Sequence, residues 1–152
     1  MTEKLDHHVQ SELCYTRPAY RQGRKFTAVK VYTVCNESKY LLIQGVPSVK
    51  LDQEMKKACE KYGKLVSAER LEDYPPLEQF TETWLVCYQF LASARHAKRF
   101  LDGKNFFGGI LHVCYAPEKE SVGDLRQKLK SRRDDVKRRL RRLANQATRP
   151  SD

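Results

Sequence analysis

The sequence predicts an α+β sandwich in which two helices cover one face of a four-stranded antiparallel sheet. Strand-like and helix-like segments follow one another in the order βαββαβ between residues 40 and 117, and the rules for split βαβ units fold that order into one such sheet. The chain has 152 residues, 40% of them hydrophobic, which is enough for one buried core. We therefore expect one domain at 28–117, with extensions at 1–27 and 118–152.

The first half of the domain is predicted to contain a strand, a helix and a second strand. Residues 28–34 alternate in character and predict an extra strand ahead of the core. A turn-type cluster at 36–39 leads into the β-rich run 40–46, which Pro47 closes. Apolar residues then recur at spacings of three and four up to Gly63 and predict a helix over about 50–62. Residues 65–71 form the next predicted strand.

The second half repeats the pattern and adds a long helix. The run 83–90 is short and largely apolar, which is typical of an interior strand. Ser93 is a candidate cap for a second helix that ends at Gly103. A turn at 105–109 leads into a last strand at 110–116. Residues 121–147 lack proline and predict a basic amphipathic helix, whose apolar stripe must pack on the sheet or on a partner.

The positive charge lies outside the core of the domain. The net charge is +10, yet residues 31–120 carry twelve basic and twelve acidic side chains. Residues 15–30 carry five basic side chains and no acidic one, and residues 121–152 carry eleven against four. Clustered Lys and Arg bind phosphates by displacing counterions, so both basic segments favour a polyanionic ligand.

Several other classes of protein are not expected. The five cysteines are odd in number and lack a C-x-x-C pair, so we expect free thiols in a reducing compartment and no zinc site. His7 and His8 have no Cys or Asp at ligand spacing, and no metal site is expected there. No apolar run approaches a membrane span and no signal peptide is visible, which predicts a soluble, unsecreted protein. Nucleotide-loop, metalloprotease and nucleophile motifs are missing, so neither an enzyme nor a cofactor is expected.

Four segments together resemble an RNA recognition motif (RRM), namely 41–46, 61–65, 94–97 and 107–116. A longer set of strings resembles one family in particular, RNA-binding protein 48: Asp6-His-His-Val9, Ala28-Val-Lys-Val-Tyr-Thr33, Tyr40-Leu-Leu-Ile-Gln-Gly-Val-Pro47 and Phe106-Phe-Gly-Gly-Ile-Leu-His-Val-Cys-Tyr-Ala-Pro117. This resemblance implies a nuclear RRM protein of the minor spliceosome. It also implies an armadillo-repeat partner and a site near the 5′ end of a small nuclear RNA.

The expected sheet lacks the aromatic residues that stack RNA bases in RRM domains. Strand alternation turns Trp84, Val86 and Tyr88 inward, and leaves Leu42 with Thr83, Leu85 and Cys87 on the outer face. Stacking contributes ~1–3 kcal/mol per base, so most of the usual affinity of this face is missing. RNA is then held elsewhere, or the sheet is covered. The apolar outer set favours covering, either by the helix at 121–147 or by a partner protein.

Two sets of candidate binding residues follow. Some of the candidates for RNA contact have an alternative role. Tyr40 can staple the hairpin instead, His112 can be a plain surface residue, and the basic arm at 15–30 can be a solvated linker. The alternative function is an adaptor whose sheet binds protein and not RNA. The RNA-binding candidates are Arg17, Tyr20, Arg21, Arg24, Lys25, Lys30, Tyr40 and His112, and the partner-binding candidates are Leu42, Leu85, Leu129, Val136 and Leu140.

Overall fold

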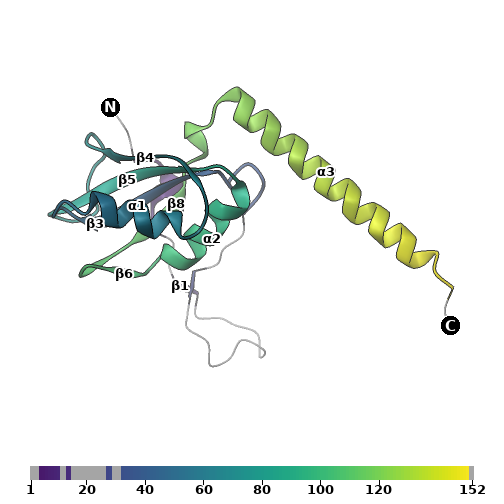
Figure 1. Cartoon of the computed structure of the whole chain (residues 1–152), viewed down its shortest axis with the longest axis horizontal. Helices are drawn as coiled ribbons and strands as arrows, with labels where there is room; N and C mark the ends of the chain where they lie inside the picture. The colour runs from purple at the N-terminus through teal and green to yellow at the C-terminus, as the bar shows by residue number, and fades with distance from the viewer. Residues whose placement is uncertain (1–3, 11–12, 15–26, 29–31, 151–152) are drawn as a thin grey trace. The chain divides into compact units, whose positions relative to one another are not determined.

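The computed structural model of the chain describes residues 4–10, 13–14, 27–28 and 32–150. They form two compact units, 1–118 and 119–152 (Figure 1). In chain order the elements of the first unit are η1 (Asp6–His8), β1 (Leu13–Cys14), β2 (Thr27–Ala28), β3 (Tyr40–Pro47), α1 (Asp52–Glu60), β4 (Leu65–Leu71), β5 (Thr81–Tyr88), α2 (Leu91–Leu101), β6 (Asn105–Phe106), β7 (Gly109–Ile110) and β8 (His112–Tyr115). The short turn η3 (Pro117–Lys119) leads to α3 (Val122–Ala147).

The predicted four-stranded antiparallel sheet is confirmed. Its strands lie in the order β4-β5-β3-β8, and each neighbouring pair is antiparallel. The register of β3 on β5 shifts between Ile43 and Val46. Gly45 lies in this irregularity with φ +85°, and a Cβ there would stand 2.5 Å from the carbonyl oxygen of Ile110. Glycine is required because the β7 backbone approaches so closely.

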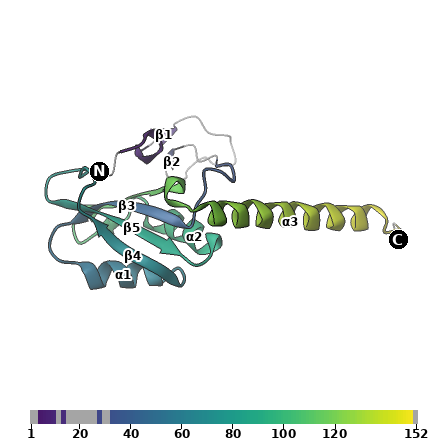
Figure 2. The ribbon, with the colours of Figure 1, turned by 90° about the horizontal axis from the view of Figure 1, so that it is seen from above.

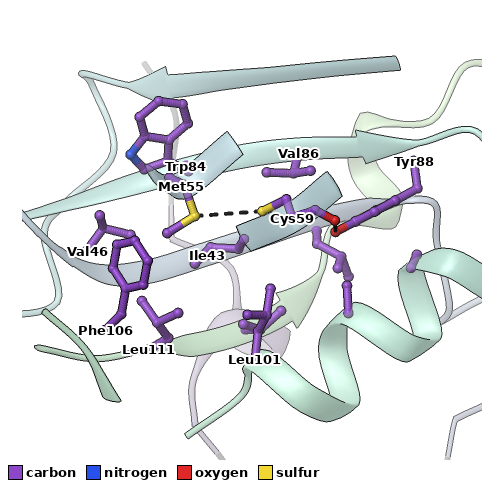
Figure 3. Packing of buried hydrophobic residues seen from close by; sticks show 14 of the residues in the cluster. Ile43, Val46, Met55, Cys59, Trp84, Val86, Tyr88, Leu101, Phe106 and Leu111 are labelled. Carbon is purple, nitrogen blue, oxygen red and sulfur yellow. Dashed lines mark hydrogen bonds between the residues drawn. The ribbon is translucent and has the colours of Figure 1, made fainter. Parts of the chain in front are cut away.

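Helices α1 and α2 lie against the same face of the sheet (Figure 2). Met55 and Cys59 of α1 and Leu101 of α2 are buried among the inward side chains of β3, β5 and β8 (Figure 3). The hydroxyl of Tyr88 donates a 2.7 Å hydrogen bond to the carbonyl of Cys59, which ties the central strand to α1. The main core therefore lies between the helices and the sheet.

The boundaries differ from the prediction at three places. Of the extra strand expected at 28–34, the described residues include β2 at Thr27–Ala28, which pairs with β1, and a turn at 34–36 in place of its last residue. Residues 29–31 lie outside the described residues. Helix α2 begins at Leu91, so Ser93 is not its cap. The Ser93 side chain lies beside Gly63 instead, where an added Cβ would stand 2.3 Å from its Oγ. The last predicted strand is divided into β7 and β8.

Helix α3 is the predicted C-terminal helix with nearly the predicted bounds. Ser121 and Asp124 form a capping box at its start, in which the Ser121 hydroxyl accepts from the Asp124 N–H at 3.1 Å. None of its residues is buried. Among the described residues, no helix combines the length and the apolar character that crossing a bilayer requires.

Candidate functional site

The sheet face opposite the helices has the side chains that strand alternation predicts. Leu42 and Leu85 lie in a second apolar cluster with Cys114, apart from the main core that holds Trp84 and Tyr88. The prediction of which residues face outward is thus confirmed. An aliphatic residue stands at each central position of this face, where RNA-binding sheets present a base-stacking ring.

This face is already covered by the protein's own β4–β5 connection. Tyr74 packs in the same cluster as Leu42 and Leu85, and only 1% of Leu42 and 7% of Leu85 remain exposed. From the sequence, α3 or a partner was expected to cover these residues, and nothing in the sequence indicated that the β4–β5 connection does so. A partner could reach Leu42 or Leu85 only if Tyr74 moved away, so their role as partner contacts stays a prediction.

The N-terminal turn η1 adds a second cover. The carbonyl oxygen of His8 accepts hydrogen bonds from Gln44 Nε2 at 3.3 Å and from His112 Nε2 at 2.7 Å. His8 Nδ1 lies 2.8 Å from the Tyr74 hydroxyl, and His8 itself is 2% exposed. Residues 5–9, Tyr74 and the outer ends of β3 and β8 therefore form one hydrogen-bonded assembly.

One carboxylate joins both histidines of this turn. Glu118 Oε2 lies 2.8 Å from His7 Nε2, and Glu118 Oε1 lies 2.6 Å from His8 Nε2. Burial alone would raise the pKa of Glu118, but its backbone hydrogen bond and the His7 and His8 rings hold that pKa below its usual value. The carboxylate is therefore ionised at neutral pH and attracts both rings.

His112, a candidate for RNA contact, is buried in this assembly. Besides its bond to the His8 carbonyl, its Nδ1 lies 3.6 Å from Asp102 Oδ1. The same carboxylate oxygen accepts a 3.1 Å hydrogen bond from the Val113 N–H. Burial alone would raise the pKa of Asp102, but the His112 ring, the Val113 N–H and the Lys98 ammonium hold it below its usual value. A nucleotide could contact His112 only if η1 moved away.

Lys98 is a buried cation beside this group. Its ammonium donates a 2.9 Å hydrogen bond to the Val113 carbonyl and lies 3.9 Å from Asp102 Oδ2. The rings of Tyr32 and Tyr115 stand 5.4 and 5.6 Å from the same nitrogen, within the range of a cation–π contact. Lys98 therefore fastens the segment before β3 to α2 and β8.

The Cys114 thiol and the Tyr74 hydroxyl, which lie at the covered face, are weaker acids than usual. Burial raises the pKa of the Cys114 thiol to about 12 and that of the Tyr74 hydroxyl to about 12. Both groups are thus neutral at physiological pH, and Cys114 behaves as a small hydrophobe. Cys35, Cys59 and Cys87 are free thiols as well, in agreement with the expectation from cysteine spacing.

The other RNA-binding candidates are only partly described. Tyr40 is half-buried at the start of β3 and packs against the Leu42 cluster. This position fits the stapling alternative and leaves part of the ring accessible. The candidates in the basic arm, Arg17, Tyr20, Arg21, Arg24, Lys25 and Lys30, lie outside the described residues.

An exposed group of stacked rings on the helical side was missed from the sequence. Phe100 is 54% exposed and lies parallel to Tyr62, at 5.8 Å, and to His96, at 6.4 Å. The Arg99 guanidinium stands 5.7 Å from the Phe100 ring. The spacing of His96 and Phe100, four residues apart in a helix, could have indicated that they are neighbours. Tyr62 lies in the turn after α1, far from both in sequence, and gave no such signal.

Helix α3 presents an apolar stripe between basic edges. Val122, Leu129, Val136 and Leu143 follow one another at seven-residue spacing, and Leu125 and Leu140 lie beside them on the same side. Between 39% and 67% of each of these side chains is exposed. Ten Lys and Arg residues and three Asp residues share the helix. The partner-binding candidates Leu129, Val136 and Leu140 are therefore accessible.

No known protein-family profile matches the sequence. Curated relatives named RNA-binding protein 48 match most of it. The zebrafish protein is 52% identical over 133 residues, which is 87% of this chain and 36% of the relative. The human protein is 52% identical over 129 residues, 85% of this chain and 35% of the relative. The chain thus spans about a third of the length of these relatives.

Solved RRM domains are among the structures to which the chain is similar. The Rna15 RRM with bound RNA has a TM-score of 0.46 and 16% identity, over 57% of this chain and 90% of that one. The third RRM of Pes4 has a TM-score of 0.47 and 17% identity, over 55% and 96%.

The topology and the sequence matches lead to the same classification. The βαββαβ order, the strand order β4-β5-β3-β8 and the two helices on one face are the arrangement of an RRM domain. About half of the residues are identical to those of the curated relatives across 85–88% of the chain. The chain carries an RRM-type domain and belongs to the RNA-binding protein 48 family.

Proposed function

We propose that this chain is the RRM-containing part of an RNA-binding splicing factor. It binds a small nuclear RNA of the minor spliceosome in the nucleus, together with an armadillo-repeat protein. The names of the relatives and the resemblance of the sequence support this assignment.

The observation that carries the proposal is the contrast between a covered sheet and an exposed basic helix. Leu42 and Leu85 provide no aromatic ring on which an RNA base could stack, and both side chains are buried. Helix α3, in contrast, exposes nine of its ten cations, while the side chain of Lys128 is largely buried in an ion pair with Glu120. Each cation that neutralises a phosphate releases a condensed counterion. The RNA is therefore held mainly through its backbone, by α3 and the basic arm at 15–30.

The salt dependence of RNA binding tests this mode. Replacing Arg138, Arg139, Arg141 and Arg142 with Gln keeps the helix propensity high and removes four charges. If all four contact phosphates, the slope of log K against log salt falls by roughly three to four. The matched control makes the same change at four exposed lysines of the neutral domain, Lys56, Lys57, Lys61 and Lys64, and keeps the wild-type slope.

The basic arm is tested in the same way. Replacing Arg17, Arg21, Arg24 and Lys25 with Ala lowers the slope by roughly one per lost contact and leaves partner binding intact. If neither four-residue variant changes affinity or slope, the backbone-binding mode is wrong. Crosslinking in nuclear extract, followed by RNA sequencing and mass spectrometry, identifies the RNA and the partner.

The second candidate function is a protein adaptor that does not itself bind RNA. The apolar stripe of α3 favours it, because phosphate contacts do not bury apolar side chains, whereas contact with a protein does. An adaptor shows no RNA affinity of its own and hence no salt slope, whereas an RNA-binding protein shows a steep one.

A further inference from the structure

The histidine pair of η1 and Glu118 place three potential metal ligands at one point. The Nε2 atoms of His7 and His8 and a carboxylate oxygen of Glu118 all lie within 4.8 Å of one another. Adjacent side chains usually diverge, but the 3-10 turn Asp6–His8 brings these two rings together, with centroids 4.5 Å apart and an edge-to-face angle of 77°. Both rings present the same nitrogen to the same carboxylate.

The surroundings hold this arrangement in place. His8 is 2% exposed, and its backbone N–H donates a 3.0 Å hydrogen bond to the carbonyl of Leu5. Its own carbonyl is fixed by Gln44 and His112. Its Nδ1 lies 2.8 Å from the Tyr74 hydroxyl, as in metal sites where a second group orients the ligating ring. With Glu118, the site thus draws on five segments of the fold, namely the N-terminal turn, β3, the β4–β5 connection, β8 and η3.

We propose that His7, His8 and Glu118 bind one Zn²⁺, through the two Nε2 atoms and one carboxylate oxygen, with water as the fourth ligand. Two imidazoles and a carboxylate are a donor set that zinc accepts in tetrahedral geometry. Mg²⁺ and Ca²⁺ prefer oxygen ligands alone, so the two nitrogens select against them. This site is independent of the proposed RNA binding.

Zinc binding requires only small changes in the cluster. In a tetrahedral site with bonds of about 2.0–2.1 Å, ligand atoms stand roughly 3.3 Å apart, so the 2.6 and 2.8 Å contacts open by about half an ångström. Each neutral ring must carry its proton on Nδ1 to present the Nε2 lone pair. For His8 the Tyr74 oxygen accepts that proton's hydrogen bond, and the 3.3 Å bond from the Leu5 N–H is lost. No proton is gained or lost by a ring that is already neutral.

The ion would cross-link the two segments that lie at the covered sheet face. It joins residues 7 and 8 to residue 118, at opposite ends of the RRM-type unit. Because His8 also holds Gln44, His112 and Tyr74, fixing this residue keeps the cover over Leu42 and Cys114 closed. Zinc therefore stabilises the closed state of the face on which other RRM domains bind RNA.

Calorimetric titration of the full chain with Zn²⁺ tests the site. We expect one ion per chain in the wild type. His7→Ala and Glu118→Gln remove a ligand while leaving His8 in place, and each weakens binding at least tenfold. Tyr74→Phe keeps the packing but loses the oxygen beside His8, and weakens binding by roughly 10–100-fold. His96→Ala removes an exposed histidine outside the cluster and leaves the affinity unchanged.

Two further readouts separate this site from zinc bound by cysteines. Zinc at about 100 times its Kd raises the Tm of the wild type by roughly 5–10 °C, and it slows alkylation of Cys114 on the covered face. Neither effect occurs in His7→Ala, whose circular dichroism spectrum must match the wild type. The proposal is overturned if the wild type shows no saturable binding, or if all variants bind equally. It is also overturned if Co²⁺ in this site gives the charge-transfer absorption of thiolate ligands.

Discussion

The carbonyl oxygen of His8 accepts a 2.7 Å hydrogen bond from His112 Nε2, although 104 residues separate the two in the chain. This bond attaches the N-terminal turn to β8, the edge strand of the sheet. With the Gln44 bond to the same oxygen, it closes the face that an RRM domain commonly offers to nucleotides. RNA binding on this face would require that the turn detach. The accessibility of the face to RNA therefore depends on the stability of the few contacts that hold the turn.

His112→Ala should therefore destabilise the domain by about 1–3 kcal/mol, because a buried hydrogen bond is lost and its partners stay buried. Urea denaturation measures the change. His96→Ala, at an exposed position on α2, should stay within about 0.5 kcal/mol of the wild type. If His112→Ala instead weakened RNA binding without affecting stability, the ring would be a direct RNA contact.

Leu85→Asp should cost more than about 3 kcal/mol, since it places a carboxylate without a partner among Leu42, Tyr74 and Cys114. Val66→Asp is the matched control, because Val66 lies in β4 of the same sheet and is 67% exposed. It should cost at most about 1 kcal/mol. Equal effects of the two substitutions in chemical denaturation would contradict the covered face.

Asp102→Asn should destabilise the protein at pH 7, and this effect should shrink as the pH falls from 7 to 3. The folded-state pKa of Asp102 lies below its ordinary value. The stability it contributes is therefore present above the unfolded pKa of about 3.9 and disappears as the pH falls through the folded pKa. The Tm of both proteins at pH 7 and pH 3 measures the difference. A gap that stayed constant across this range would show that the charge of Asp102 contributes nothing.

The sheet and the direction of its side chains could be predicted because both depend on local periodicity. Alternation along β5 sends Trp84 and Tyr88 toward the helices and Leu85 away from them, whatever the rest of the chain does. The same local pattern predicted nearly the observed bounds of α3, and the structure adds the capping box at Ser121, which was not predicted. The predicted start of α2 was wrong because the helix begins after Phe90, whose side chain makes no capping hydrogen bond that a local rule would recognise.

The cover over the sheet could not be predicted, because its contacts join distant segments. His8 lies 66 residues from Tyr74 and 110 residues from Glu118. In the sequence, no Cys or Asp stands at ligand spacing from the histidine pair, so local spacing predicts no metal site there. The third ligand of the proposed site comes from the other end of the domain. Spacing rules find metal sites only when the ligands share one element or one loop.

The stripe and the basic face of α3 can be tested separately. Leu129, Val136 and Leu140 have no buried contacts in the helix, so replacing all three with Gln should leave the Tm of the domain unchanged. A partner that buries the stripe would lose three aliphatic anchors, each of which contributes about 1.5–3 kcal/mol when fully buried. Its affinity should fall by at least 100-fold in calorimetry with the proposed armadillo-repeat partner.

The matched control is the triple variant Lys130→Gln, Arg138→Gln and Arg141→Gln, which changes three exposed positions on the other side of the same helix. It should keep partner affinity and lower the RNA salt slope by roughly two to three. The stripe variant should do the reverse, keeping the salt slope while losing the partner. If both variants lost only partner affinity, α3 would contact the partner protein and not RNA. The RNA would then be held by the arm at 15–30 or by the partner.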